Sequence, residues 1–327
     1  MGSKKKIVLI GASFLILNLL IVLLSTIGSV NLKLGEIFSA LVNNDNKMVT
    51  TIVYQMRLPR NLLAVLVGAN LAIAGALLQA VMKNPLADPG ITGVSSGASV
   101  AAIIILLLMP QYTSILPIIA FIGGGVACIL VYSMAWKKGL QPTRVVLAGV
   151  AVNAILGGII SLLTTLYSDK IQSALLWLNG SLSSKTWYDL RMLAIYSVIG
   201  LVTAMFCARS ANVLNLGDEY ATNLGFNVNF TRVILSVVAV FLAATSTAIV
   251  GIISFVGLIV PHVSRMIIGS DHKYSLPFSM ILGGIVLLVA DTMARTIGGA
   301  LELPVGVIMS VVGGPFFLYL LRKKGAV

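Results

Sequence analysis

The feature that most restricts the fold of this chain is a succession of apolar stretches, each about as long as a membrane-spanning helix. A helix needs roughly 20 apolar residues to cross a bilayer. About ten stretches meet this requirement, and the short, glycine-bounded stretch at 252–268 leaves nine as the alternative. The predicted spans are 7–30, 60–81, 91–109, 114–135, 144–167, 190–209, 232–250, 252–268, 276–297 and 304–321.

These stretches leave almost no length for a water-exposed domain. The chain is 58% hydrophobic and only 10% charged, which is typical of a protein with many membrane spans. We therefore predict an all-α integral membrane protein in which residues 1–327 form a single transmembrane domain. The first stretch follows Lys4, Lys5 and Lys6 but lacks a small-residue cleavage pattern, so we interpret it as a retained helix and not a signal peptide.

The distribution of lysine and arginine predicts the orientation. Placing the N-terminus in the cytoplasm and alternating across ten spans puts 14 of the 22 basic residues on the cytoplasmic side. Both termini and the polar block at 209–232 are then predicted to be cytoplasmic. This topology explains the net charge of +12. The sequence has no basic run interleaved with aromatic residues, so it does not indicate nucleic-acid binding.

Enzyme chemistry is not indicated. The sequence contains no G-x-x-x-x-G-K-[ST], no G-x-S-x-G, no H-E-x-x-H and no Cys/His cluster, so we expect neither an ATPase site, nor a resident metal, nor a bound cofactor. Transport or conduction is the default for such a chain. A carrier driven by an ion gradient usually keeps several charges within its spans. Here Asp291 is the one acidic residue well inside a span, and we expect it to pair with Arg295 one turn further along the helix.

The 209–232 block, RSANVLNLGDEYATNLGFNVNFTR, separates two long apolar stretches. Asp218 and Glu219 followed by Gly225 predict a short helix with an acidic first turn and a glycine stop. Because such an apolar chain has little other reason to keep an ordered polar helix, we interpret the block as a contact site for another protein.

Three further motifs lie near predicted span ends. Arg57 and Arg60 flank Pro59 at the start of the second span, which fits either interfacial anchoring or a pair of outward cations awaiting an acidic partner. NPLADPG (84–90) predicts a tight turn. GVSSGAS (93–99) would let helices touch closely or line a pathway.

Three long blocks resemble the FecCD-type permeases, the membrane subunits of importers for iron–siderophores, haem and cobalamin. They are RLPRNLLAVLVGANLAIAGALLQAVMKNPLADPGITGVSSGAS (57–99), GIISFVGLIVPHVSRMIIGSDHKYSLP (251–277) and ADTMARTIGGALELPVGVIMSVVGGPFFLYLL (290–321). The resemblance implies a type II ABC importer permease fold with ten helices, in the bacterial cytoplasmic membrane. The partners it implies are a second permease subunit, identical or paralogous, two ATP-binding-cassette ATPase subunits that bind ATP and Mg²⁺, and an extracytoplasmic binding protein.

The resemblance also implies residue roles. The ATPase-coupling segment would comprise Gly217, Asp218, Glu219, Tyr220, Ala221, Leu224 and Gly225. Docking of the binding protein would involve Arg57, Arg60 and Arg295, and the pathway candidates on the fifth span are Asn153, Ser161, Thr164 and Thr165. We expect the cargo to be a ferric siderophore; haem and cobalamin are the alternatives, and an ion-coupled secondary carrier is the competing class.

Overall fold

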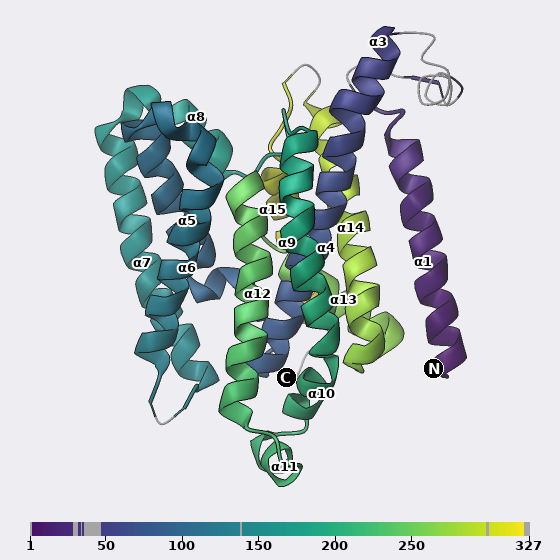
Figure 1. Cartoon of the computed structure of the whole chain (residues 1–327), viewed down its shortest axis with the longest axis vertical. Coiled ribbons are helices and arrows are strands. Elements are labelled where there is room, and N and C mark those ends of the chain that lie inside the picture. The colour runs from purple at the N-terminus through teal and green to yellow at the C-terminus, as the bar shows by residue number, and fades with distance from the viewer. Residues whose placement is uncertain are drawn as a thin grey trace.

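The computed structural model describes residues 2–28, 32–33, 35, 47–137, 139–298 and 301–323, and its regular elements are helices (Figure 1). The first half contains α1 (Ser3–Leu24), α3 (Lys47–Thr50), the π-helix η1 (Thr51–Arg57), α4 (Leu58–Met82), η2 (Pro89–Thr92), α5 (Val94–Ile103), η3 (Ile104–Leu108), η4 (Pro110–Ile115), α6 (Leu116–Ala135) and α7 (Pro142–Leu166). The second half contains η5 (Ser168–Lys170), α8 (Ile171–Leu178), α9 (Trp187–Phe206), α10 (Ala208–Asn215), α11 (Asp218–Asn223), α12 (Val228–Val250), α13 (Val256–Ile268), α14 (His272–Ile297) and α15 (Val305–Lys323).

Each predicted span corresponds to an apolar helix. Within the described residues, seven helices are long and apolar enough to cross a membrane, and three shorter apolar helices account for the other predicted spans. The seven are Ser3–Leu24, Lys47–Met82, Pro110–Ala135, Pro142–Leu166, Trp187–Phe206, Val228–Val250 and His272–Ile297, and the shorter three are Val94–Leu108, Val256–Ile268 and Val305–Tyr319. The prediction of an all-α membrane fold with about ten spans is therefore confirmed. The last two residues of the first predicted span, 29 and 30, lie outside the described residues.

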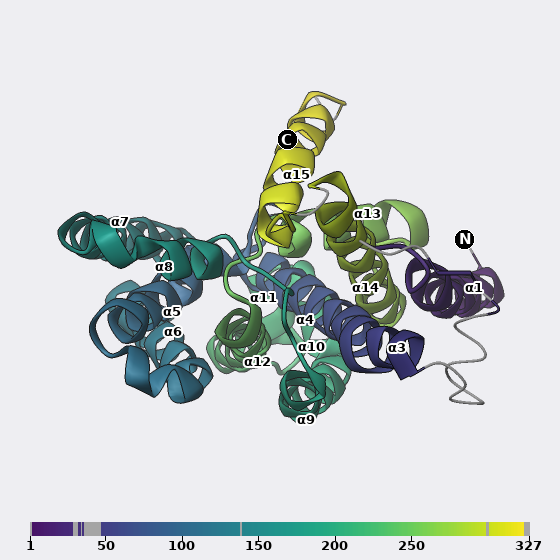
Figure 2. The same ribbon diagram turned by 90° about the horizontal axis from the view of Figure 1, so that it is seen from above.

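Helix α4 is the central element of the fold. Most of its residues are buried, and it packs against α9, α12, α13 and α14. Figure 2 shows it in the middle of the molecule, with α5, α6 and α7 on one side and α1, α13 and α14 on the other. The N-terminus and α11 lie at one end of the long axis in Figure 1, which we call the α11 end, and α3 lies at the opposite end, the α3 end.

Glycines allow the close helix contacts around α4. A Cβ added to Gly75 would overlap the carbonyl group of Gly257 at the start of α13, and one added to Gly68 would overlap the carbonyl of Gly283 in α14. Helices in a membrane gain stability by such close backbone approach, because apolar side chains find no advantage over lipid there.

The segment after α12, which crosses back through the molecule, is only partly helical. The 23 residues of α12 rise about 34 Å, whereas the 13 residues of α13 rise only about 20 Å. Residues 251–255, which have no helical structure, cover the remaining depth and end in Phe255, whose φ is +69°. Inside a membrane such backbone is tolerated where protein groups or a cavity satisfy it.

The side chain of Gln79 binds the start of α13, directly after this segment. Its Nε2 donates to the carbonyls of Ala87, Gly257 and Leu258 at 3.2–3.3 Å. Its Oε1 accepts from the guanidinium of Arg265 at 2.6 Å. One buried amide on α4 therefore holds the turn after α4 and the start of α13 together.

The packing of Gly75 predicts a severe effect of substitution. In Gly75→Leu the α4 and α13 backbones must separate, and we expect a loss of about 3 kcal/mol or more of stability, seen as a lower melting temperature and aggregation in detergent. Gly158→Leu is the matched control, because a Cβ there meets nothing within 4 Å. Equal melting temperatures for the two variants would contradict the packing argument.

Candidate functional site

The segment 217–225 forms the short helix that the sequence predicts. Helix α11 runs from Asp218 to Asn223 and carries both acidic residues in its first turn. The chain leaves it through Gly225, whose φ is +82°, and the amides of Gly225 and Phe226 close on the carbonyls of Thr222 and Ala221 at 2.9 and 3.0 Å. A left-handed residue at this position is the usual end of a helix, and it explains the glycine. Helix α11 lies at the extreme of the molecule in Figure 1.

Asp218 attaches α11 to the membrane helices. Its Oδ1 accepts from Nζ of Lys83, just beyond the end of α4, at 2.6 Å. Both carboxylate oxygens accept from Nη2 of Arg232 in α12, at 2.9 and 3.0 Å. Arg232 is buried and also donates to the carbonyl of Leu140, so the ion pairs join α11, α4, α12 and the loop before α7.

The charge state of this attachment follows from its surroundings. Partial burial acts to raise the pKa of Asp218, but hydrogen bonds and charge interactions with Lys83 and Arg232 outweigh it and hold the pKa below its ordinary value. A carboxylate whose folded-state pKa is lowered stabilises the structure at neutral pH, and that contribution is lost as the pH falls through the lowered pKa. The attachment is therefore intact at neutral pH.

The other predicted coupling residues divide into a buried and an exposed set. Ala221 is fully buried. Tyr220 and Leu224 are 67% and 60% exposed, and Glu219 and Gly225 are exposed beside them, whereas Gly217 is half-buried. Large apolar side chains on an exposed helix tip form a surface suited to insertion into a groove of another protein.

The three predicted docking arginines lie at the α3 end, but they are buried there. Arg57 donates to the carbonyls of Ser25 and Thr26 beyond the end of α1, at 2.8 and 3.2 Å. Arg295 donates to Oδ1 of Asn61 at 2.8 Å. The side chains of Arg57 and Arg295 are thus held within the chain in this structure, and their role in docking a binding protein stays a prediction.

Arg60 is the centre of an ionic cluster at the same end. It binds the fully buried carboxylate of Asp291 through Nε and Nη2, at 2.9 and 3.0 Å, and Oε2 of Glu302 through Nη1 at 2.7 Å. The side chain of Glu302 remains 38% exposed. Asp291 had been expected to pair with Arg295, yet that contact is the longer one, at 3.7 Å. The bidentate geometry favours Arg60, which comes from another helix.

The four pathway candidates on α7 do not form one group. Asn153 lies near the middle of the helix and donates to the carbonyl of Gly90 at 3.0 Å, which ties α7 to η2. Ser161, Thr164 and Thr165 lie two to three turns further along; the hydroxyls of Thr164 and Thr165 donate to carbonyls of their own helix. Ser161 and Thr165 are exposed.

A polar cavity of about 230 Å³ lies beside η2. Asp88, Ser95, Ser96 and Thr247 line it together with residues 252–254, the non-helical backbone before α13. Sequence reasoning singled out the turn at 84–90 and the small residues at 93–99, but it did not foresee that they enclose a cavity with Thr247 and Ser254. The only feature of the sequence that pointed to this cavity was the run of small and turn-forming residues.

The cluster around Arg60 predicts a large loss of stability when one partner is removed. Arg60→Gln leaves the Asp291 carboxylate buried without its bidentate partner, which costs about 3–5 kcal/mol. Adding Asp291→Asn removes the stranded charge, so the double variant should recover most of the melting temperature. Arg191→Gln, at an exposed position on α9, is the control. If Arg60→Gln melts at the same temperature as Arg191→Gln, the cluster does not support the fold.

Comparison with known proteins agrees with this architecture. A solved inward-facing structure that is assigned to the metal-chelate type of ABC transporter superposes with a TM-score of 0.86 and 28% identity, covering 96% of this chain and 99% of that chain. A second similar structure, PsaBC from Streptococcus pneumoniae in complex with Fab, has a TM-score of 0.56 and 17% identity, covers 88% of this chain and 95% of that chain, and supports the fold alone.

Sequence relatives cover nearly the whole chain. The Fe(3+)-citrate import system permease protein YfmE of Bacillus subtilis (strain 168) is 38% identical over 315 residues, 95% of this chain and 94% of the relative. The probable heme-iron transport system permease protein IsdF of Staphylococcus aureus (strain bovine RF122 / ET3-1) is 37% identical over 316 residues, 95% of this chain and 96% of the relative. The model of the FecCD transport family matches residues 15–323. The chain therefore belongs to the FecCD transport family, the membrane permeases of ABC importers.

Proposed function

We propose that this chain is the membrane subunit through which an ATP-driven importer carries a ferric chelate into the bacterial cytoplasm. The observation that supports it most is α11, an exposed helix that Asp218 anchors to Lys83 after α4 and to Arg232 in α12, in a chain with only 10% charged residues. Two ATPase subunits would bind ATP and Mg²⁺ and contact α11, one on each of two permease subunits. The permease itself would contribute no catalytic group.

This function requires the α11 end to be cytoplasmic. The excess of basic residues predicted for that side supports the orientation. The N-terminus of α1 lies at the same end as α11 in Figure 1, which agrees with a cytoplasmic N-terminus. A cytoplasmic C-terminus is part of the same proposal, although residues 324–327 lie outside the described part of the chain.

The extracytoplasmic binding protein would then dock at the α3 end. Arg57 and Arg295 would act there by fixing the ends of α1, α4 and α14, since both are buried. Arg60 is the arginine that an acidic residue of the binding protein could reach most directly, because its partner Glu302 is partly exposed and could be displaced. Such docking would weaken with salt.

The pathway would lie between two permease subunits and be lined in part by α7. Ser161, Thr164 and Thr165 would face it, while Asn153 would hold α7 against η2. The polar cavity beside Asp88 would offer hydroxyl groups on the same route.

The cargo class rests on the relatives. One is named for ferric citrate and another for haem iron, at nearly equal identity. Both cargoes are iron complexes, so a ferric chelate is the proposed class, with ferric siderophores included in it and haem as the second candidate. Cobalamin and a stand-alone ion-coupled carrier are the competing readings.

Uptake assays separate these cargoes. A strain that lacks this chain should lose uptake of at least one of ⁵⁵Fe-citrate, a ferric hydroxamate and haem. Reintroducing the gene should restore that uptake only when the partner ATPase is active. Restoration of cobalamin uptake alone would contradict the cargo class. Transport by the reconstituted chain alone under an ion gradient would contradict the importer.

The exposed face of α11 predicts a coupling defect without a folding defect. Tyr220→Ala with Leu224→Ala removes the two large exposed side chains, so co-purification of the ATPase and chelate-stimulated ATP hydrolysis should each fall about tenfold or more, on the scale of an interface hot spot. The control is Phe206→Ala, which removes an 83% exposed side chain from α9. Asp218→Asn should retain the ATPase but lower uptake per ATP hydrolysed. Unchanged coupling in the Tyr220 and Leu224 double variant would exclude α11 as the contact.

A further inference from the structure

An apolar groove runs between α6 and α12 on the face of the molecule away from α7 and α15. Its volume is about 540 Å³, and its walls include Phe121, Gly125, Cys128, Tyr132, Ser236 and Val240. Exposed apolar side chains such as Ile129 and Val237, at 70% and 60% exposure, flank it. The groove therefore opens on a surface suited to the hydrocarbon of a membrane.

The length of the groove fits a single lipid chain. From Trp136, at the α11 end, to Phe121, it follows 15 residues of α6 and the residue after it, which is about 22 Å. The hydrocarbon of one leaflet is about 15 Å thick, half of the roughly 30 Å core. An acyl chain that enters from the α11 side would therefore reach past the middle of the bilayer before it meets Phe121.

The polar groups of the groove lie toward the α11 end. Tyr132 is one helical turn from Trp136, and Ser236, which faces it from α12, is only 3% exposed. The two hydroxyls interact with each other, and among the described residues neither has another hydrogen-bond partner. When one hydroxyl donates to the other, the second still has a proton to donate, so the couple can bind one further acceptor in the groove.

The charges of α6, α12 and the loop between α6 and α7 are all basic, and Arg232 of α12 is already paired with Asp218. Lys137 follows Trp136 and is exposed, and the sequence from Trp136 to Arg144 carries three basic residues. Neither α6, nor the loop that follows it, nor α12 contains an aspartate or glutamate. The mouth of the groove is thus suited to an anionic group and the rest to an alkyl chain.

We propose that this groove binds one anionic glycerophospholipid from the leaflet at the α11 end. The phosphate would lie at Trp136 and Lys137, an ester carbonyl would accept a hydrogen bond from the Tyr132–Ser236 couple, and one acyl chain would extend along Gly125 to Phe121. The proposal is independent of the transported cargo.

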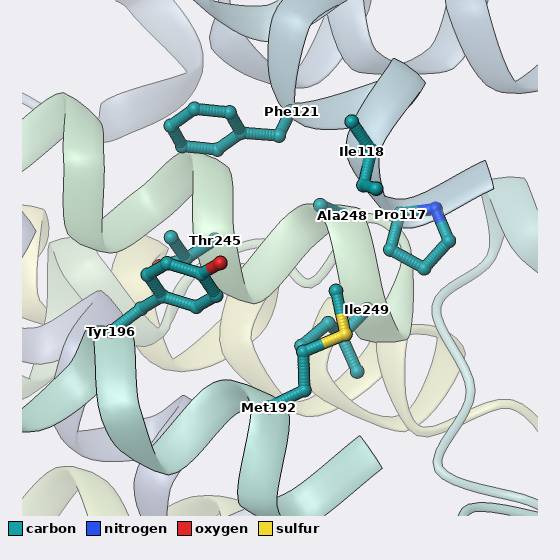
Figure 3. A pocket seen from close by; sticks show the side chains of 8 residues that line it. All are labelled: Pro117, Ile118, Phe121, Met192, Tyr196, Thr245, Ala248 and Ile249. Atoms are coloured by element: carbon teal, nitrogen blue, oxygen red, sulfur yellow. The ribbon is translucent and has the colours of Figure 1, made fainter. Parts of the chain in front are cut away.

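The far end of the groove is closed by aromatic side chains. The ring of Phe121 packs edge-on against Phe241, with centroids 6.1 Å apart, and Tyr196 packs on the same ring from α9. Beyond Phe121 lies a smaller pocket of about 120 Å³, shown in Figure 3, with Phe121 on one side and Tyr196 and Met192 on the other. This volume could take only the end of an acyl chain, so it limits the length of acyl chain that the groove can hold.

Gly125 offers a direct test. A Cβ at this position meets nothing within 4 Å, so Gly125→Leu fills the groove without disturbing a helix contact. The purified full chain would be mixed with equimolar dioleoylphosphatidylglycerol and dioleoylphosphatidylcholine and examined by native mass spectrometry. We expect one phosphatidylglycerol per chain, preferred about fivefold, the factor that one lysine near an anionic surface supplies. Gly125→Leu should lower its retention at least tenfold, whereas Gly11→Leu, an equally open position on α1, should leave it unchanged.

Two further variants distinguish the parts of the site and serve if Gly125→Leu fails to fold. Lys137→Gln should bring the preference for phosphatidylglycerol close to one without loss of total lipid. Tyr132→Phe with Ser236→Ala should lower retention of both lipids about threefold or more. Equal retention by Gly125→Leu and Gly11→Leu, or no preference for phosphatidylglycerol in the unmodified chain, would overturn the proposal. So would displacement of phosphatidylglycerol by an equal concentration of oleate, since the groove would then be a fatty-acid site.

Discussion

The hydrogen bonds of the Gln79 side chain join the turn after α4 to the start of α13, beside two of the breaks in the helical backbone. In a bilayer each unpaired backbone group costs several kcal/mol, so a break in a spanning helix needs partners from the protein itself. Gln79 supplies them for Ala87, Gly257 and Leu258, and Arg265 fixes its orientation through the amide oxygen. The cavity beside Asp88 lies where these two breaks meet. Arg60, Asn61 and Asn70 are also buried polar residues of α4, but Gln79 is the one whose side chain links the turn after α4 to the start of α13.

Helix α4 also connects the two ends of the molecule. Arg60 in its first turn holds Asp291 and Glu302 at the α3 end, and Lys83 just beyond its last residue holds Asp218 at the α11 end. The stretch from Arg60 of α4 to Lys83 forms a rod of about 34 Å. Glycine contacts with α13 and α14 press both helices against this rod. A displacement of α11 would therefore reach the far end through a rigid element and not through a chain of loops.

The sequence was sufficient for features that depend on local composition. Apolar length located the spans, and the acidic turn and glycine around Asp218 and Gly225 located α11. Features that depend on distant partners were not predictable. Arg60 and Asp291 are 231 residues apart, so nothing near either residue indicates their pairing, whereas the local i,i+4 rule pointed to Arg295. Similarly, the charges of Arg57 and Arg295 suggested exposure, but carbonyls at the end of α1 and the amide of Asn61 made their burial possible.

The positions of the ion pairs bear on how such a chain could be driven. Those within the described residues that involve buried side chains lie near the two ends of α4, at Asp218 and around Asp291. A carrier driven by an ion gradient needs titratable or ion-binding groups whose charge changes within the membrane. A mechanically driven subunit instead needs ionic contacts that stay closed while helices move as rigid bodies, and ion pairs at the ends of a central helix serve that purpose. Under the proposed function, the buried arginines Arg60 and Arg232 therefore hold helices together. The free energy for transport is transmitted through the exposed side chains of α11.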